Sequence, residues 1–296
     1  MLTVSHLNKQ FNKQPVIKDV SFTLEKGRCT ALIGPNGAGK TTILRMLTGL
    51  IKPTSGTITY NHPDDFRRII GYLPQYPKFH EWMTGKEFLT YCGKLYGLSN
   101  EETKTRVVNL LEEVDLTDAQ NKQISKYSGG MKQRLGLAHA LIHQPEILFL
   151  DEPVSSLDPL GRRDVLTLMQ RLKKDVTILF STHILNDADE VSDSLIVVKD
   201  GTVVEQGTIA SLEEKYTTSK IIVQFSAEHE SLMEELKRLS TVNEIELIGN
   251  NLHIFVTDVE LAQNELFSFI EEQKLSLVEY RIGRLTIEEM FVKAVN

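Results

Sequence analysis

The sequence is short of cysteine, of long apolar runs and of positive charge, and each shortage excludes a class of protein. Its only cysteines, Cys29 and Cys92, stand isolated, so we expect two packing residues rather than a disulfide framework or a cysteine-ligated metal. The longest apolar runs are a few residues, far below the ~18 to 20 that cross a bilayer. The first residues also lack the charged and apolar parts of a signal segment. We therefore expect a globular chain that does not itself enter the membrane.

Charge is distributed unevenly along the 296 residues, whose net charge is −7. Residues 217–296 carry 7 lysines and arginines against 14 aspartates and glutamates, whereas residues 1–216 carry 26 of each kind. An acidic segment disfavours a nucleic-acid backbone as its partner, so we expect no nucleic acid, and a solvated surface is the simplest interpretation. The length and the 41% hydrophobic content fit roughly two globular domains.

The most informative motif is glycine-rich: residues 34–41 read GPNGAGKT and match G-x-x-x-x-G-K-[ST]. An apolar strand pattern, Cys29 to Ile33, precedes it and an apolar helix pattern follows. Glycines let the backbone curl so that N–H groups point inward, and the helix adds its positive N-terminal end. The sequence therefore predicts a site for the phosphates of ATP or GTP. The candidate ligands, with Lys40 as the charge and the Thr41 hydroxyl as a ligand of Mg²⁺, are Asn36, Gly37, Gly39, Lys40, Thr41 and Thr42.

Two carboxylates follow a second apolar run, Ile147 to Leu150. This run is typical of a buried parallel strand, whose carboxyl end lies at the edge where nucleotide sites occur. We interpret Asp151 as a ligand of Mg²⁺ and Glu152 as the group that orients and polarises the attacking water. An isolated Asp-Glu-Pro would more simply be an acidic helix cap, but the phosphate loop upstream favours the catalytic interpretation.

A third motif, Ser128-Gly129-Gly130, precedes another helical pattern, and Ser128 is predicted to be its N-cap. Such a junction also offers N–H groups and a hydroxyl to an anion, although nothing within one chain needs a second phosphate-binding helix end. The segment resembles the signature motif of ATP-binding cassette (ABC) proteins. In that family the motif contacts the γ-phosphate held by the opposite subunit, so the resemblance implies a dimer.

The resemblance extends from about Leu2 to Tyr216 and implies further roles. Phe11 matches the aromatic that stacks on adenine, and Gln75 matches the glutamine that senses Mg²⁺ and water. Asp158, in Ser156-Leu157-Asp158, matches the loop that communicates across the dimer, and His183 matches the histidine that contacts the γ-phosphate. Each has an ordinary structural interpretation as a core residue, turn residue, helix cap or strand-end histidine. The ordered set favours the family.

Two positions depart from the family's signature, which usually reads Leu-Ser-Gly-Gly-Gln. Tyr127 stands for the leucine and Met131 for the glutamine, so an amide that could bond nucleotide or the partner is lost. Phe11 in place of the commoner tyrosine keeps the ring face and loses only a hydroxyl.

The resemblance implies an α/β fold for residues 1–216: a P-loop NTPase cassette with an antiparallel β subdomain and a helical subdomain over about residues 76–140. Residues 217–296 are predicted to form a separate α+β domain that begins after Thr217-Thr218-Ser219. Alternating runs at 221–225, 245–256 and 275–280, with helices at 230–239 and 261–272, give the βαββαβ order of a ferredoxin-like sandwich. A capping box at Thr286 to Glu289 is predicted to start a last helix.

The resemblance implies an ATPase subunit of a transporter that works with integral membrane permease subunits and a second cassette, either a copy or a relative. The protein would lie in the cytoplasm on the inner face of the membrane, and the C-terminal extension resembles those of bacterial drug and antibiotic exporters. Phe79 or Trp82 is predicted to contribute to permease docking. Two alternatives are a soluble ABC ATPase that remodels a non-membrane partner such as the ribosome, and a regulatory module that no longer hydrolyses ATP.

Overall fold

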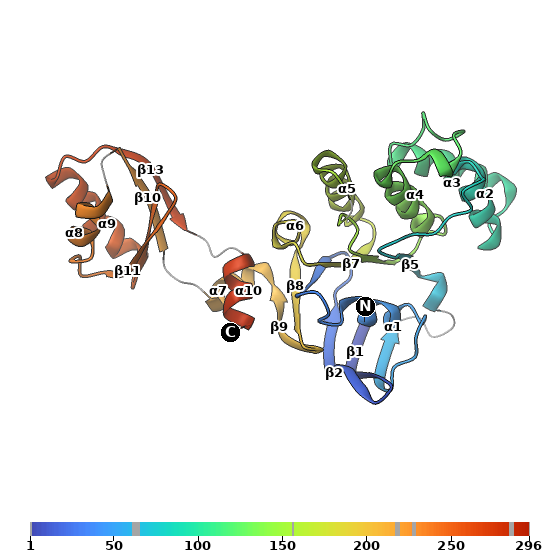
Figure 1. The fold of residues 1–296 in the computed structure, drawn as a ribbon, viewed down its shortest axis with the longest axis horizontal. Helices are drawn as coiled ribbons and strands as arrows, with labels where there is room; N and C mark the ends of the chain where they lie inside the picture. Colours follow the sequence, from blue (N-terminus) through green and yellow to red (C-terminus); the bar gives the residue numbers. More distant parts are fainter. Residues whose placement is uncertain are drawn as a thin grey trace. The chain divides into compact units, whose positions relative to one another are not determined.

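The computed structural model describes residues 2–60, 66–155, 157–216, 220–226, 229–283 and 287–295. Its backbone forms two compact units, residues 1–209 together with 291–296, and residues 210–290 (Figure 1). The predicted break at residues 217–219 lies outside the described residues, and the predicted boundary stays a prediction. Within the described ranges, no helix combines the length and the apolar composition that a membrane span requires.

The centre of the first unit is a six-stranded sheet in the order β5-β6-β7-β3-β8-β9, parallel except for β9. Its strands are β3 (Cys29–Ile33), β5 (Ile70–Leu73), β6 (Ile147–Asp151), β7 (Thr177–Thr182), β8 (Ser194–Lys199) and β9 (Thr202–Thr208). Every residue of β3, β6 and β7 is buried, which is why apolar residues predominate in these strands. The three strands bring their carboxyl ends to one edge of the sheet.

Strand β3 has the predicted bounds, whereas β6 and β7 run further than their apolar residues indicate. Asp151 pairs with Ser181, and Thr182 pairs with Ile33, so these polar residues belong to the ladder. The apolar residues of β7 end at Phe180, but the strand continues because the buried hydroxyls of Ser181 and Thr182 have hydrogen-bond partners and need no water.

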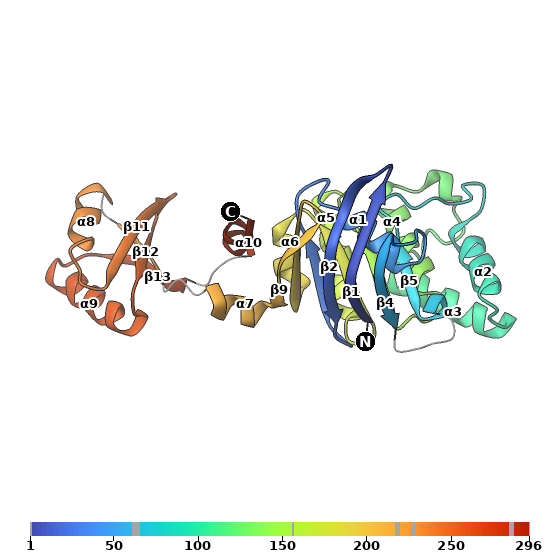
Figure 2. The ribbon, with the colours of Figure 1, turned by 90° about the horizontal axis from the view of Figure 1, so that it is seen from below.

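An antiparallel sheet and one helix cover one side of the central sheet (Figure 2). The sheet order is β2-β1-β4, and the elements are β1 (Leu2–Phe11), β2 (Gln14–Leu24), β4 (Ser55–Tyr60) and α1 (Lys40–Leu47). Leu7 and Ile17 of the sheet pack with Ile43 and Leu44 of α1 in one buried cluster. Burial of these side chains fixes the start of α1, and with it the glycine-rich loop, against the sheet.

The other helices of the first unit include a group near strand β5, which Figure 1 shows as α2, α3 and α4. Their bounds are α2 (Gly85–Leu95), α3 (Asn100–Glu113) and α4 (Gly129–Leu141), with short 3₁₀ turns at Phe66–Arg68 and Ile124–Lys126. Thr84 and Ser99 start α2 and α3 with complete capping boxes. This group is the predicted helical subdomain. Two further helices, α5 (Pro159–Leu172) and α6 (Leu185–Val191), follow β6 and β7, and α7 spans Ile209–Tyr216.

The second unit contains a four-stranded antiparallel sheet in the order β11-β12-β10-β13. Its elements are β10 (Lys220–Phe225), α8 (His229–Leu236), β11 (Val242–Ile248), β12 (Asn251–Val256), α9 (Val259–Glu272) and β13 (Leu277–Gly283), and α10 spans Ile287–Val295. Leu236 of α8 and Leu266 of α9 pack with Ile221, Val223 and Ile254 of the sheet. The βαββαβ chain order, with the first and third strands central, is that of the predicted ferredoxin-like sandwich.

Two predicted bounds in the second unit were wrong. The strand expected from Leu275 begins at Leu277, because the Leu275 N–H donates to the carbonyl of Ile270 and Lys274 has φ 49°, which closes the end of α9. Helix α8 ends at Leu236 rather than at residue 239. The predicted capping residue Thr286 lies outside the described residues.

Candidate functional site

The glycine-rich loop runs from the end of β3 into α1 and encloses the side chain of Lys40. Lys40 is 5% exposed, and its ammonium donates to the carbonyls of Gly34 at 2.7 Å and Pro35 at 3.1 Å. Gly39 precedes α1 with φ 106°, and a Cβ there would lie 2.4 Å from the Cδ1 of Ile17, so only glycine fits. Burial lowers the pKa of Lys40, and the negative charges of Glu152 and Asp151 oppose this shift. The loop therefore holds a cation at its centre.

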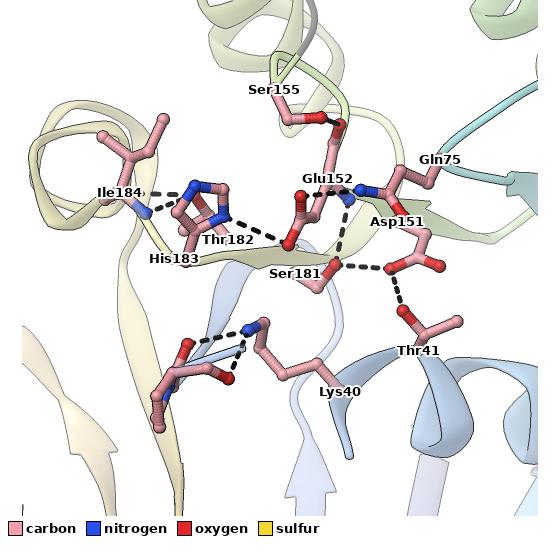
Figure 3. A network of polar contacts seen from close by, with 12 residues as sticks. Lys40, Thr41, Gln75, Asp151, Glu152, Ser155, Ser181, Thr182, His183 and Ile184 are labelled. Atoms are coloured by element: carbon pink, nitrogen blue, oxygen red, sulfur yellow. Dashed lines mark hydrogen bonds and ion pairs between the residues drawn. The ribbon is translucent and has the colours of Figure 1, made fainter. Parts of the chain in front are cut away.

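A hydroxyl and a carboxylate meet beside this loop (Figure 3). Thr41 Oγ1 donates to Asp151 Oδ1 at 3.0 Å, and Ser181 Oγ donates to the same oxygen at 2.8 Å. The other oxygen, Asp151 Oδ2, is buried and has no hydrogen-bond partner among the described residues. Burial raises the pKa of Asp151, and the two hydroxyls oppose this shift. An unpaired carboxylate oxygen next to a threonine hydroxyl fits the oxygen ligands that Mg²⁺ prefers.

Glu152 is fixed by a hydrogen bond from its backbone N–H and by one contact to each carboxylate oxygen. Its φ of 47° is unusual for a residue with a side chain, and its N–H donates to Ser181 Oγ at 2.9 Å. Gln75 Nε2 donates to Glu152 Oε2 at 2.9 Å, and His183 Nδ1 lies 3.1 Å from Oε1. Figure 3 shows Gln75 and His183 on opposite sides of the carboxylate. Because both neighbours fix it, Glu152 is oriented without any ligand.

These side chains line a cleft of about 660 Å³. Its lining comes from the loop before α1, from α1 and from the carboxyl ends of β5, β6 and β7. The lining residues are Val16, Asn36, Gly37, Gly39, Lys40, Thr41, Thr42, Gln75, Tyr76, Glu152, Ser155 and His183. The cleft thus gathers the residues that the sequence assigns to phosphate, water and Mg²⁺, with Asp151 directly beneath them.

Other predicted site residues lie outside this cleft. Phe11 is 45% exposed at the end of β1, with the Lys9 ammonium 4.9 Å from its ring centre. Ser128 caps α4 by accepting from the N–H of Met131 at 3.2 Å, and Gly129 and Gly130 form the first turn of that helix. Asp158 caps α5 by accepting from the N–H of Gly161 at 3.2 Å. The signature segment therefore presents an exposed helix N-terminus that its own cleft does not use.

Sequence reasoning missed four residues of the site. Ser181 is fully buried and joins the Asp151 carboxylate to the Glu152 backbone. A serine that ends an apolar strand at the same edge as the phosphate loop could have indicated this position. Ser155 and Tyr76 each lie close in sequence to a predicted residue, whereas no pattern marks Val16, which reaches the cleft only through the packing of β2.

The two residues predicted to dock a permease differ in exposure. Trp82 is 70% exposed, whereas the ring of Phe79 is half-buried and packs edge-on against Phe88, with centroids 5.2 Å apart. Tyr76 and Leu95 are also largely exposed. Trp82 is therefore not a buried residue of the helical subdomain.

Comparisons with known proteins define the family. Residues 17–155 match the family described as ABC transporter, and residues 207–295 match the family described as ATP-binding protein DrrA1-3-like, C-terminal domain. The ABC transporter ATP-binding protein YxlF of Bacillus subtilis is 47% identical over 297 residues, which cover 100% of both chains. The linearmycin resistance ATP-binding protein LnrL of the same organism is 30% identical and covers 99% of this chain and 97% of its own. The Nod factor export ATP-binding protein I of Burkholderia lata is 34% identical over 86% of each chain.

Solved structures agree with this assignment. One, described as the ATP-binding subunit of an ABC transporter, has a TM-score of 0.67 at 33% identity and covers 80% of this chain and 100% of its own. Another, a dimeric post-hydrolysis state of the ATP-binding cassette MJ0796 with ADP and Pi, has a TM-score of 0.64 at 26% identity and covers 71% and 99%. The chain belongs to the family of ABC transporter ATP-binding proteins. It is an ATPase built on a P-loop cassette.

Proposed function

We propose that the protein powers a separate membrane permease in the direction of export, through ATP-driven closure of two cassettes. The observation that carries the proposal is the placement of Glu152 between Gln75 and His183, next in the chain to Asp151, which pairs with Thr41. A site that binds ATP without hydrolysing it would not need a carboxylate held in this orientation. The order of these groups therefore favours a hydrolytic subunit over a regulatory module.

In this proposal each residue of the cleft has a defined task. Lys40 and the N–H groups of residues 36–42 bind the outer phosphates. Their attraction for the phosphate charge is stronger in a buried loop than in water. Glu152 orients the attacking water and accepts its proton, while Gln75 and His183 keep the carboxylate directed into the cleft. Mg²⁺ would be held by Thr41, Asp151 and Gln75, and when bound it neutralises phosphate charge.

A second cassette completes the site. Ser128 and the two glycines after it lie at an exposed helix N-terminus outside the cleft of their own chain, and such an end favours an anion. We assign this end to the γ-phosphate bound by a partner cassette, and Asp158 to communication between the two sites. The dimeric state of the similar cassette MJ0796 supports this arrangement. Phe11 is proposed to stack on the adenine.

The names of two relatives support the proposed direction of transport. Linearmycin resistance and Nod factor export, in the names of two similar proteins, both fit the removal of a compound from the cell. The protein would then bind the inner face of the cytoplasmic membrane through its permease. We assign permease contact to Trp82, since 70% exposure of the single tryptophan leaves a large aromatic surface for a partner.

The central test is the Glu152→Gln variant. The amide keeps the size of the side chain but cannot accept a proton, so we expect kcat for ATP hydrolysis to fall by about 100-fold or more and ATP-bound dimers to accumulate. Phosphate release and light scattering measure the two effects, with Glu112→Gln on the exposed face of α3 as the control. Normal hydrolysis by Glu152→Gln, or a monomer with ATP saturating, would contradict the proposal.

The permease contact is tested separately by co-purification with the membrane subunit. Replacement of Phe79 and Trp82 by alanine is expected to weaken association, with Trp82 giving the larger effect because it is the more exposed. Leu50→Ala, at another exposed apolar position, is the matched control. Unchanged association of the doubly substituted chain would remove this docking assignment and leave the ATPase assignment intact.

A further inference from the structure

A partly buried ion pair outside the cleft joins α5 and α6, the helices that follow two of the site's loops. Arg162 lies in the first turn of α5, one turn after Asp158, and Asp187 lies in α6, one turn after His183. The Arg162 Nε and Nη2 atoms lie 2.6 Å and 2.5 Å from the same oxygen, Asp187 Oδ1. The Asp187 side chain is 1% exposed and that of Arg162 31%.

This ion pair is a costly way to join two helices if stability alone is at stake. Burial raises the pKa of Asp187, and Arg162 opposes the shift, while Asp187 Oδ2 is buried without a partner among the described residues. Well-packed apolar residues hold helices together as well as a buried ion pair does, or better. The arrangement therefore points to a role in fixing geometry.

Helix α6 is short, and two kinds of polar contact hold its start: Thr182 Oγ1 bonds the backbone of Ile184, and the ion pair fixes the first turn to α5. Helix α6 spans only Leu185–Val191, and its N-cap residue, Ile184, makes no side-chain capping bond. His183 stands directly before it, has 39% of its side chain exposed and contacts Glu152 at 3.1 Å. A short helix that shifted by about 1 Å would carry the imidazole out of reach of Glu152.

The other end of the pair faces the loop that leads into α5. Arg162 borders a hollow of about 540 Å³ whose other lining residues are Leu157, Pro159, Arg163, Leu166 and Glu190. The Arg162 N–H donates to the carbonyl of Asp158 at 2.9 Å, so a movement of that residue would displace Arg162, and Asp187 would pass the displacement to α6.

We propose that Arg162 and Asp187 are positioning residues, which couple the loop at Asp158 to the imidazole of His183 and so hold it against Glu152. This inference rests on the proposed function, since it assigns the pair a task in the same hydrolytic site. Neither residue touches the cleft. Their effect on catalysis passes through His183.

The full-length chain with Asp187→Asn tests the proposal, because the amide keeps the shape and removes the charge. We expect kcat for ATP hydrolysis to fall about tenfold or more, and ATP affinity to change little because Lys40 and Thr41 stay in place. Asp189→Asn, the same change on the exposed face of α6, is the control and should leave kcat unchanged. If Asp187→Asn folds poorly, Arg162→Gln repeats the test, with the same change at its exposed neighbour, Arg163→Gln, as the control. Arg162→Lys keeps the positive charge and should therefore retain part of the rate that Arg162→Gln loses.

A double-mutant cycle distinguishes positioning from general stability. If Asp187 acts through His183, then Asp187→Asn lowers single-turnover hydrolysis in the wild-type background and has no further effect in a His183→Ala background. Equal factors in both backgrounds, or a loss no larger than that of Asp189→Asn, would overturn the inference. A wild-type chain that binds ATP without hydrolysing it would overturn the proposed function itself, together with this role.

Discussion

The hydroxyl of Ser181 joins the Asp151 carboxylate to the backbone of Glu152, and its removal gives the sharpest test of how the site is built. Ser181 Oγ donates to Asp151 at 2.8 Å and accepts from the N–H of Glu152 at 2.9 Å, and the side chain is fully buried. Ser181→Ala removes both bonds and adds no atoms. The variant leaves Thr41 as the remaining hydroxyl on Asp151.

The expected cost follows from the two bonds. A hydrogen bond to a charged group contributes about 1.5–3 kcal/mol, and a buried N–H left without a partner costs about 1–3 kcal/mol. The bonds share one hydroxyl, so the terms do not simply add, and we expect the free energy of unfolding to fall by about 3 kcal/mol. The Glu152 backbone, with φ 47°, loses the bond that holds it in this conformation. We therefore also expect kcat to fall about tenfold.

Calorimetric unfolding and steady-state phosphate release measure these effects, with Ser192→Ala as a matched control. Ser192 Oγ is also buried, but it has no hydrogen-bond partner among the described residues, so its removal should change stability by less than about 0.5 kcal/mol. Equal losses of stability for Ser181→Ala and Ser192→Ala would refute the reasoning, as would an unchanged kcat for Ser181→Ala.

Two further predictions concern titratable groups. Burial raises the pKa of Cys29 to about 12 and that of Cys92 to about 11, so both stay protonated and neither should react with a thiol reagent at pH 8 until the chain is unfolded; immediate reaction of the native protein would contradict this. Hydrogen bonds from Ser240, and to a smaller extent from Thr241, hold the pKa of Glu265 below its ordinary 4.5. These bonds therefore stabilise the fold above that pH, and their contribution is lost as the pH falls and Glu265 becomes protonated. Acid unfolding of Glu265→Gln should accordingly show a weaker pH dependence below 4.5 than the wild type, and identical curves would count against it.

Sequence reasoning predicted those parts of the fold in which the local sequence alone determines the structure, such as buried apolar strands and helix caps. The run Cys29–Ile33 is apolar except for Thr30 and is followed by a glycine, so both its burial and its end could be predicted. Ser128 and Asp158 precede apolar helical patterns, and both cap their helices. Composition alone marks such positions because each local preference agrees with the final structure.

The parts that could not be predicted depend on contacts between distant segments. Ser181 and Thr182 are polar, so apolar periodicity stops before them, yet both are buried in the ladder because partners from elsewhere satisfy their hydroxyls. The backbone conformation of Glu152 has no local signal either, since glutamate rarely adopts a positive φ. Asp187 and Arg162 are separated by a whole strand and two loops, so only the fold reveals the pair.

The two residues that depart from the family's signature, Tyr127 and Met131, are accommodated by contacts within this chain. Tyr127 is 6% exposed, and its hydroxyl donates to the carbonyl of Ala119 at 2.8 Å, so the larger side chain is satisfied within the helical subdomain. The space for it comes from Gly85, where a Cβ would lie 2.4 Å from the tyrosine hydroxyl. Met131 supplies its backbone N–H to Ser128, a bond that any residue at that position would make. The exposed N-terminus of α4 thus keeps Ser128 and the two glycines, the groups that we propose bind a phosphate of the partner cassette.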